Sequence, residues 1–126
     1  MRNRRIKRSR LQTIYLRNRS VTKDNEGVPT ESFGAAYEKK AEVWTASERR
    51  QIEMYGDRVS NIANVRVQGR YDIEMRNSIM HIVFEDGNSL TSGDGVCINV
   101  AQTDPPDYRV LTITPHRPVR LEIERI

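Results

Sequence analysis

The sequence predicts an all-β fold, mainly antiparallel, built as a small β-barrel or sandwich with one short helix or long loop around residues 47–58. Apolar and polar side chains alternate along several segments, and this period of two is typical of strands with one buried and one solvent-exposed face. Turn-forming Gly, Pro, Asn and Asp residues separate these segments. About six or seven short strands with frequent turns favour a barrel or a two-sheet sandwich.

The alternation is clearest in three segments, residues 33–45, 63–73 and 119–124. In the first of them, Tyr37 and Ala41 are interleaved with charged side chains. Each segment therefore predicts a strand with one face in the core and the other in water. Weaker strand candidates are residues 11–18, 79–85, 96–101 and 108–114.

Turns separate the predicted strands. Residues 24–27, 86–88 and 93–95 contain Gly with Asn or Asp, which tolerate positive backbone φ angles. Residues 104–107 and 115–118 contain Pro, which has no N–H to donate and therefore interrupts a central strand.

One segment, residues 47–56, departs from the strand period. Ser47 is a candidate N-cap, Gly56 is a candidate stop, and the residues between them favour a helix. The segment has only three sizeable apolar side chains, so it buries little surface. We therefore expect either a short helix of low stability or a mobile loop.

Basic residues are concentrated at the N-terminus, in the stretch MRNRRIKRSRLQTIYLRNR. These 19 residues contain eight Arg or Lys and no acidic residue, whereas the other 107 residues carry −4 (13 basic, 17 acidic). Such a stretch suits contact with nucleic-acid phosphates or with an acidic protein surface, and the third alternative is a solvated chain end. We expect residues 1–10 to form a basic arm and residues 11–126 a single β-barrel domain.

Composition argues against several classes of protein. No apolar run approaches the roughly 20 residues of a membrane span, and none follows the basic N-terminus as a secretory signal would require. Cys97 is the single cysteine, so an internal disulfide is excluded and a reducing compartment is expected. We therefore expect synthesis in the cytoplasm and no contact with a membrane.

No constellation of residues indicates catalysis, and we predict no enzymatic activity and no cofactor. His81 and Cys97 lie in separate predicted strands, where a Cys is usually a small buried hydrophobe and not a nucleophile. Together with His116 they offer three well-separated ligands, whereas a structural zinc site needs four that lie close together.

Other polar motifs have simple structural interpretations. Glu122 and Glu124 share the exposed face of a predicted strand, so both carboxylates are expected to be solvated. The Gly-Asp-Gly of residues 93–95 lacks the Lys-Ser/Thr of a phosphate-binding loop and predicts a turn. Tyr15, which lies between basic residues, is the best candidate for stacking on a nucleic-acid base.

Residues 10–47 read RLQTIYLRNRSVTKDNEGVPTESFGAAYEKKAEVWTAS. They give, in order, a strand, the turn of residues 24–27, a β-rich segment ending near Val43-Trp44, and the start of a polar loop. This order resembles the N-terminal half of the tailed-bacteriophage head–tail joining family, also called head-closure, stopper or adaptor proteins. Residues 108–113 and 119–126 resemble the aromatic-led strand and the final charged strand of that family.

The resemblance implies a structural protein of the phage neck, made in the host cytoplasm and incorporated into the virion. A small β-barrel would assemble as a homo-oligomeric ring that matches the symmetry of the portal above it. The ring would retain packaged DNA and provide the surface for tail attachment. Its partners would be the portal or an adaptor above, a tail-completion or tail-terminator protein below, further copies of itself, and double-stranded DNA bound in the channel without regard to sequence.

The resemblance also assigns roles to two sets of residues. The loop between the second and third main strands would face the channel, and on this chain it comprises Glu48, Arg49, Arg50, Gln51, Glu53, Met54, Tyr55, Asp57 and Arg58. The basic arm would contact DNA, the portal or another partner through Arg2, Arg4, Arg5, Lys7, Arg8 and Arg10. A pore lined wholly by positive charge would slow the exit of DNA, which favours placing the arm at a protein interface.

The alternative function is that of a nucleic-acid-binding module, a small β-barrel of the OB or SH3 type with a basic N-terminal arm. This alternative predicts steeply salt-dependent binding by the isolated chain, because each phosphate contact releases counterions. Deletion of residues 1–10 would then abolish the binding.

Overall fold

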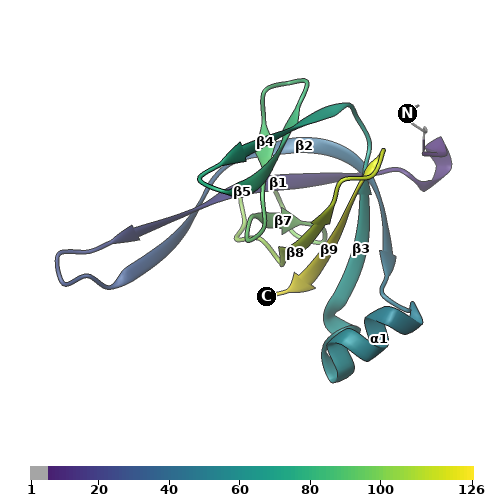
Figure 1. Cartoon of the computed structure of the whole chain (residues 1–126), viewed down its shortest axis with the longest axis horizontal. Helices are drawn as coiled ribbons and strands as arrows, with labels where there is room; N and C mark the ends of the chain where they lie inside the picture. Colours follow the sequence, from purple (N-terminus) through teal and green to yellow (C-terminus); the bar gives the residue numbers. More distant parts are fainter. Residues whose placement is uncertain (1–5) are drawn as a thin grey trace.

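The computed structural model describes residues 6–126, and they form a closed six-stranded barrel and a separate three-stranded sheet (Figure 1). The strand order around the barrel is β1-β2-β3-β9-β8-β7, and the second sheet has the order β4-β5-β6. The paired strands are antiparallel, which confirms the predicted all-β class. The barrel strands are β1 (Gln12–Lys23), β2 (Pro29–Thr45), β3 (Ile62–Val67), β7 (Gly95–Cys97), β8 (Tyr108–Thr114) and β9 (Val119–Arg125), and the second sheet contains β4 (Tyr71–Arg76), β5 (Ile79–Phe84) and β6 (Ser89–Leu90).

Helical structure is confined to three short elements in residues 6–126. A 3₁₀ turn, η1 (Arg8–Arg10), precedes β1, and α1 (Arg49–Tyr55) is followed directly by η2 (Gly56–Asn61) between β2 and β3. Within this described part of the chain, no helix has the length and apolar character needed to cross a membrane.

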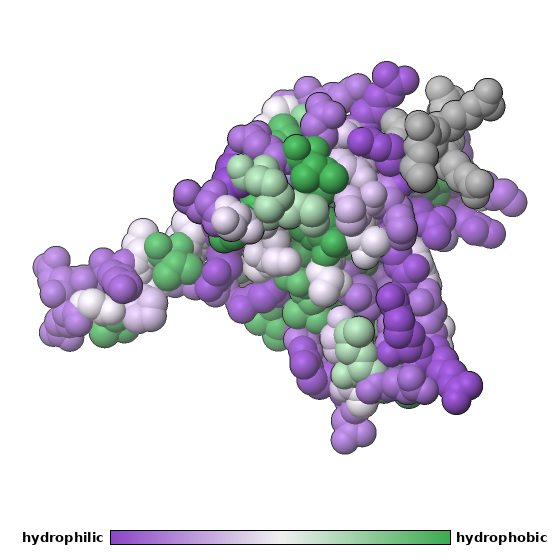
Figure 2. Space-filling view, viewed as in Figure 1, coloured by the Kyte–Doolittle hydropathy of each residue, from purple (hydrophilic) through white to green (hydrophobic). Residues whose placement is uncertain are grey.

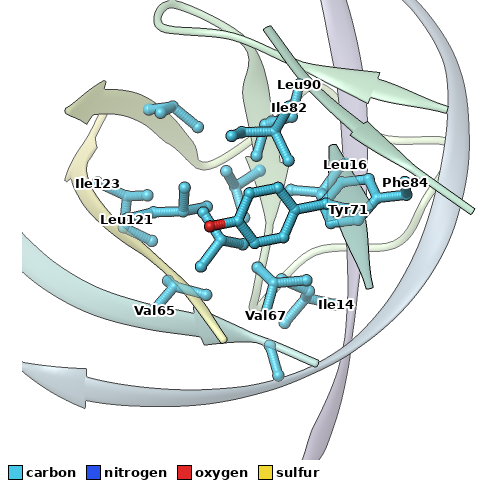
Figure 3. Close-up of a cluster of buried hydrophobic side chains, with 14 of the residues drawn as sticks. Ile14, Leu16, Val65, Val67, Tyr71, Ile82, Phe84, Leu90, Leu121 and Ile123 are labelled. Atoms are coloured by element: carbon cyan, nitrogen blue, oxygen red, sulfur yellow. The ribbon is translucent and has the colours of Figure 1, made fainter. Parts of the chain in front are cut away.

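The hydrophobic core lies inside the barrel and continues under the second sheet (Figure 3). Alternate residues of β1, β3 and β9 point inward, and residues of β4, β5 and β6 close one side. Each fully buried Leu or Ile stabilises the fold by about 1.5–3 kcal/mol relative to an exposed one. The side chains labelled in Figure 3 are Ile14, Leu16, Val65, Val67, Tyr71, Ile82, Phe84, Leu90, Leu121 and Ile123.

The prediction of one continuous strand over residues 63–73 is wrong. β3 ends at Val67, and Gly69 has a φ of +126°, a conformation that favours glycine because it has no Cβ. The chain then starts β4 at Tyr71, in the other sheet. The odd-numbered residues stay apolar on both sides of this turn, so the period of two by itself did not reveal the break.

Most other predicted strands are confirmed, with shifted ends. Residues 108–114 form β8 as predicted, whereas only two residues of the predicted strand 96–101, Val96 and Cys97, belong to β7. The two-residue strand β6 was not predicted. β1 and β2 run on past their predicted ends at Asn18 and Phe33 to the turn at residues 24–27.

This extension creates a two-stranded ribbon that projects from the barrel (Figures 1 and 2). We use "the ribbon" for residues 20–32, all of which are exposed. Ser20 faces Ser32, Thr22 faces Thr30, and the two Ser hydroxyls lie 2.8 Å apart. The ribbon therefore has one face of small polar side chains, a pattern without the apolar residues by which strands are usually recognised.

Candidate functional site

The predicted channel loop is a helix in the structure. Glu48 is the N-cap of α1, in place of the predicted Ser47, and the backbone N–H of Ile52 donates to the Glu48 carbonyl at 3.0 Å. Gly56, with a φ of +55°, ends the helix as predicted. The Gly lets the chain turn directly into η2, which returns it to the start of β3.

The helix is attached to the barrel by a buried polar cluster, which we define as Gln51, Asn64 and Glu122. Gln51 is only 1% exposed, and its Nε2 donates to Asn64 Oδ1 at 2.6 Å and to Glu122 Oε2 at 2.8 Å. The Thr112 hydroxyl donates to the other Glu122 oxygen at 2.8 Å. Side-chain hydrogen bonds therefore join α1 to β3 and β9, which are neighbouring strands of the barrel.

The expectation that Glu122 is solvated is wrong. Its even-numbered position does point away from the barrel interior, but α1 lies over that face and leaves Glu122 only 8% exposed. Burial raises the pKa of the Glu122 carboxyl. The hydrogen bonds from Gln51 and Thr112, with the nearby charge of Arg50, outweigh this effect and hold the pKa below its ordinary value.

The apolar side chains of α1 face solvent. Ile52 is 50% exposed and Met54 61%, whereas the buried side chain of this helix is the polar Gln51. A helix of seven residues with this inverted arrangement has little hydrophobic attachment to the barrel. Its docking therefore depends on the polar cluster and on ion pairs at its edges.

The charged residues of the predicted loop are mostly paired within the chain. Arg49 Nε lies 3.2 Å from Glu53, and Arg58 makes two hydrogen bonds of 2.8 Å to Glu124. Arg50 makes no ion pair within the described residues. All nine predicted loop residues thus lie in one segment, but Gln51 is buried beneath it, and Tyr55 is half-buried.

The described part of the basic arm, residues 6–10, lies at the other end of the β2–β3 pair from α1 (Figure 1). Ile6 is buried, while Lys7, Arg8 and Arg10 are exposed, and the guanidinium of Arg10 approaches Glu42 at 3.8 Å. Arg2, Arg4 and Arg5 lie outside the described residues. The structure therefore does not bring the described part of the arm together with the predicted channel loop.

A tryptophan between two arginines forms a further feature of the outer barrel surface. The guanidinium of Arg66 lies 5.2 Å from the centre of the Trp44 ring, and that of Arg120 lies 5.5 Å from it. Arg66 and Arg120 are directly opposed on β3 and β9, and contact with the electron-rich ring face offsets their mutual repulsion. Arg120 also reaches Glu48 at 2.7 Å, which links this surface to α1.

His81 and Cys97 occupy separate strands, β5 and β7, as predicted. Cys97 is 1% exposed, and burial raises the pKa of its thiol, which disfavours the reactive thiolate. Residues 6–126 contain no group of three or more His, Cys, Asp or Glu side chains placed to hold a metal ion.

Asp94 has a role that its position in a Gly-Asp-Gly turn did not reveal. Its carboxylate, 2% exposed, accepts hydrogen bonds from the backbone N–H groups of Arg19 and Thr91 and from the Asn18 amide, at 2.9–3.1 Å. These contacts fix the point where the ribbon leaves the barrel. Asp94 therefore acts as a structural anchor.

A cavity of about 410 Å³ lies beside the β4–β5 hairpin, open to solvent. Arg117 lines it, with its guanidinium 4.3 Å from the centre of the Tyr71 ring and donating to the Tyr71 carbonyl at 2.9 Å. Both signs of charge are present, so the cavity has no clear preference for an anion or a cation. Its lining residues are Arg70, Tyr71, Asp72, Val83, Phe84, Glu85 and Arg117.

Comparisons of the chain with protein-family models, curated proteins and solved structures give no match.

Proposed function

We propose that the chain is a structural protein of a tailed-phage neck, which assembles as a ring beneath the portal, retains packaged DNA and offers an attachment surface to the tail. The sequence resemblance to head–tail joining proteins suggests this function. The observation that carries it is the α1–η2 segment: a charged, weakly attached helix between the second and third barrel strands, where the resemblance requires the channel loop.

The attachment of α1 supports a segment that can change position. A helix held by apolar packing would expose much new apolar surface on moving, whereas α1 already exposes Ile52 and Met54. Moving it would exchange the hydrogen bonds of Gln51, and the ion pairs of Glu48 with Arg120 and of Arg58 with Glu124, for bonds to water. Such an exchange costs about 1 kcal/mol per bond. A segment of this kind can open and close a channel at low energetic cost.

The charges of the segment suit a steric gate. Glu48, Glu53 and Asp57 balance the three arginines at positions 49, 50 and 58, and several of these charges are paired within the chain. A loop with balanced charge attracts DNA phosphates weakly, so it would block the channel without holding the DNA during ejection. Its partners would be the portal or an adaptor above, a tail-completion or tail-terminator protein below, and neighbouring copies of the chain.

The test is deletion of the gene from the phage that encodes it, followed by electron microscopy of purified particles. We expect DNA-filled heads that lose their DNA and tails that remain unattached, with both defects repaired by the wild-type gene supplied in trans. Intact virions in the absence of the chain would exclude the proposed function.

The alternative, a nucleic-acid-binding module, is favoured by one observation. The exposed Lys7, Arg8 and Arg10 lie on the same barrel as the Arg66–Trp44–Arg120 stack, so cations and an aromatic ring are both available. This function predicts tight binding of the isolated chain to duplex or single-stranded DNA, with affinity falling steeply between 50 and 200 mM salt. The neck function predicts weak binding by the isolated chain at either salt concentration.

A further inference from the structure

The β4–β5 hairpin, residues 71–84, exposes three large apolar side chains. Ile73 is 49% exposed, Met75 62% and Ile79 54%. Ile73 and Met75 lie opposite Ile82 and Met80, on the face of the hairpin that continues the buried core, whereas Ile79 lies opposite Arg76 on the other face. Figure 2 shows apolar side chains gathered over this region. An apolar surface that continues a core is typical of a protein interface.

The outer edge of β4 is also open. Within the described residues β4 pairs with β5 and with no other strand, and its N–H and C=O groups on the far side have no strand partner. Natural proteins usually protect such an edge by covering it or pairing it. The edge therefore adds a second, independent reason to expect a partner at the hairpin.

The charge of this region restricts the choice of partner. Residues 71–86 contain four acidic residues and one Arg, a net charge of −3 with His81 neutral. Glu74 pairs with Arg76 at 3.0 Å and Asp86 pairs with Lys39 at 2.9 Å. Asp72 and Glu85 make no ion pair within the described residues, although Arg70 and Arg117 line the adjoining cavity with them. A partner surface should therefore be basic.

Four surfaces of a second copy could meet the hairpin, and charge distinguishes them. On the outer barrel surface Arg66 and Arg120 are already paired, with Glu42 at 3.7 Å and Glu48 at 2.7 Å. The ribbon carries −2, from Lys23 against Asp24, Glu26 and Glu31, and would be repelled. The α1–η2 segment together with its N-cap Glu48 has balanced charge and, in the proposed ring, faces the channel. The N-terminal end, residues 6–10, carries +3 with no acidic residue, and Lys7 and Arg8 make no ion pair within the described residues.

We propose that the β4–β5 hairpin of one copy docks against the basic N-terminal end of a second copy. The inference rests on the ring of the proposed function and names the two surfaces that build it. Figure 1 places the turn of the hairpin and the N-terminal end on opposite sides of the molecule. Two different surfaces on opposite sides give a head-to-tail contact, which closes into a ring when the rotation between copies is suitable.

Site-directed cross-linking of the full chain tests the contact. One protein carries Met75→Cys, a second, tagged protein carries Arg8→Cys, and the mixture is treated with a short bismaleimide at low salt. We expect a mixed dimer as the main product, reduced at least about five-fold at 500 mM salt because screening weakens the charge attraction. The native Cys97 is buried, and the chain without an introduced cysteine is the control for any reaction of the bismaleimide with Cys97.

The matched control replaces Arg8→Cys by Val21→Cys, on the exposed ribbon. Equal cross-linking of Met75→Cys to Val21→Cys and to Arg8→Cys, or no cross-linking to Arg8→Cys, would overturn the inference.

Charge reversal provides a second test. Two double variants reverse the charges, Asp72→Lys with Glu74→Lys in the Met75→Cys protein and Lys7→Glu with Arg8→Glu in the Ser9→Cys protein. Each double variant alone should lower cross-linking between these two proteins. Cross-linking should recover when the two reversed surfaces are combined, and further loss in that combination contradicts the contact.

The outcome of the cross-linking tests is separable from that of gene deletion. If cross-linking follows the expected pattern but intact virions form without the gene, the interface stands and the neck function is excluded. If cross-linking fails but virions do not form without the gene, the neck function stands and the interface is excluded.

Discussion

At the scale of single residues, Gln51 takes the place that an apolar residue usually has on a docked helix. Its amide joins α1 to Asn64 on β3 and to Glu122 on β9, at 2.6 and 2.8 Å. Such bonds are directional, so they fix the helix in one position, and one of the acceptors is a titratable carboxylate. The position of α1 should therefore depend on the protonation of Glu122.

The sign of this dependence follows from the lowered pKa of Glu122. The folded state holds the carboxylate ionised at a pH where the unfolded chain already binds a proton, so stability falls as pH decreases through the folded pKa. We expect Glu122→Gln to lower the free energy of unfolding by about 1 kcal/mol at pH 7, since an amide offers Gln51 and Thr112 only one acceptor oxygen. The difference from wild type should shrink as pH falls from about 5 to about 3.

Urea unfolding across this pH range measures the effect, and Glu53→Gln is the matched control. Glu53 is an exposed carboxylate on the same helix and forms its ion pair at the surface, so its variant should follow wild type. A stability difference for Glu122→Gln that stays constant with pH would show that the charge of Glu122 does not support the docking of α1.

At the scale of elements, the alternation of side chains predicted the strands with one face in the core. It predicted β2, β3 and β9, because the barrel interior accepts only apolar residues, whereas residues 108–114 (β8) were a weaker candidate. The same pattern does not show where a strand changes sheets, so it predicts one strand over residues 63–73. The glycine at position 69 was the available signal, because Gly inside a strand pattern often marks a bend.

The polar cluster was missed for a different reason. Asn64 and Glu122 have the parity of the outer face, and the sequence does not reveal that a short helix covers that face. The predicted loop residues were correctly grouped in one segment, but the burial of Gln51 depends on three elements coming together. The sequence does not predict the ribbon, because neither of its faces is buried. Its residues therefore show no alternation of apolar and polar side chains.

The ribbon should contribute little to stability. Replacing residues 20–32 with Asn-Gly joins Arg19 to Phe33, which are paired across the strands, through a two-residue hairpin turn. We expect the free energy of unfolding to change by about 1 kcal/mol or less, because every removed residue is exposed and the ion pairs of Glu31 with Arg19 and Arg109 are partly exposed. Thermal and urea unfolding measure this, and Leu16→Ala in the core should cost about 2–5 kcal/mol in the same assay. Loss of cooperative unfolding in the shortened chain would contradict the prediction.

At the scale of the whole molecule, closure of the barrel depends on its shortest strand. β7 has three residues, and it joins β1 through three residue pairs and β8 through two. The other barrel pairs are longer, so this seam is the place where the barrel is held by the fewest backbone bonds. Gly95 belongs to both ladders, opposite Arg17 on one side and Arg109 on the other.

Gly95→Ala should therefore weaken the closed barrel. A Cβ at this position would lie 2.8 Å from Pro106 Cβ and 3.0 Å from Phe33 Cδ1, and Pro106 is buried with little freedom to move. Forcing a methyl group into a packed site costs about 1–3 kcal/mol, which urea unfolding would detect.

Gly34→Ala is the matched control, since a Cβ there would have the Asn18 carbonyl oxygen as its nearest neighbour, at an ordinary 3.8 Å. Hydrogen exchange should show faster exchange of β7 and β8 amides in Gly95→Ala than in the control. Equal stability of the two variants would mean that the seam tolerates expansion and that closure does not depend on the close approach of β7 to its neighbours.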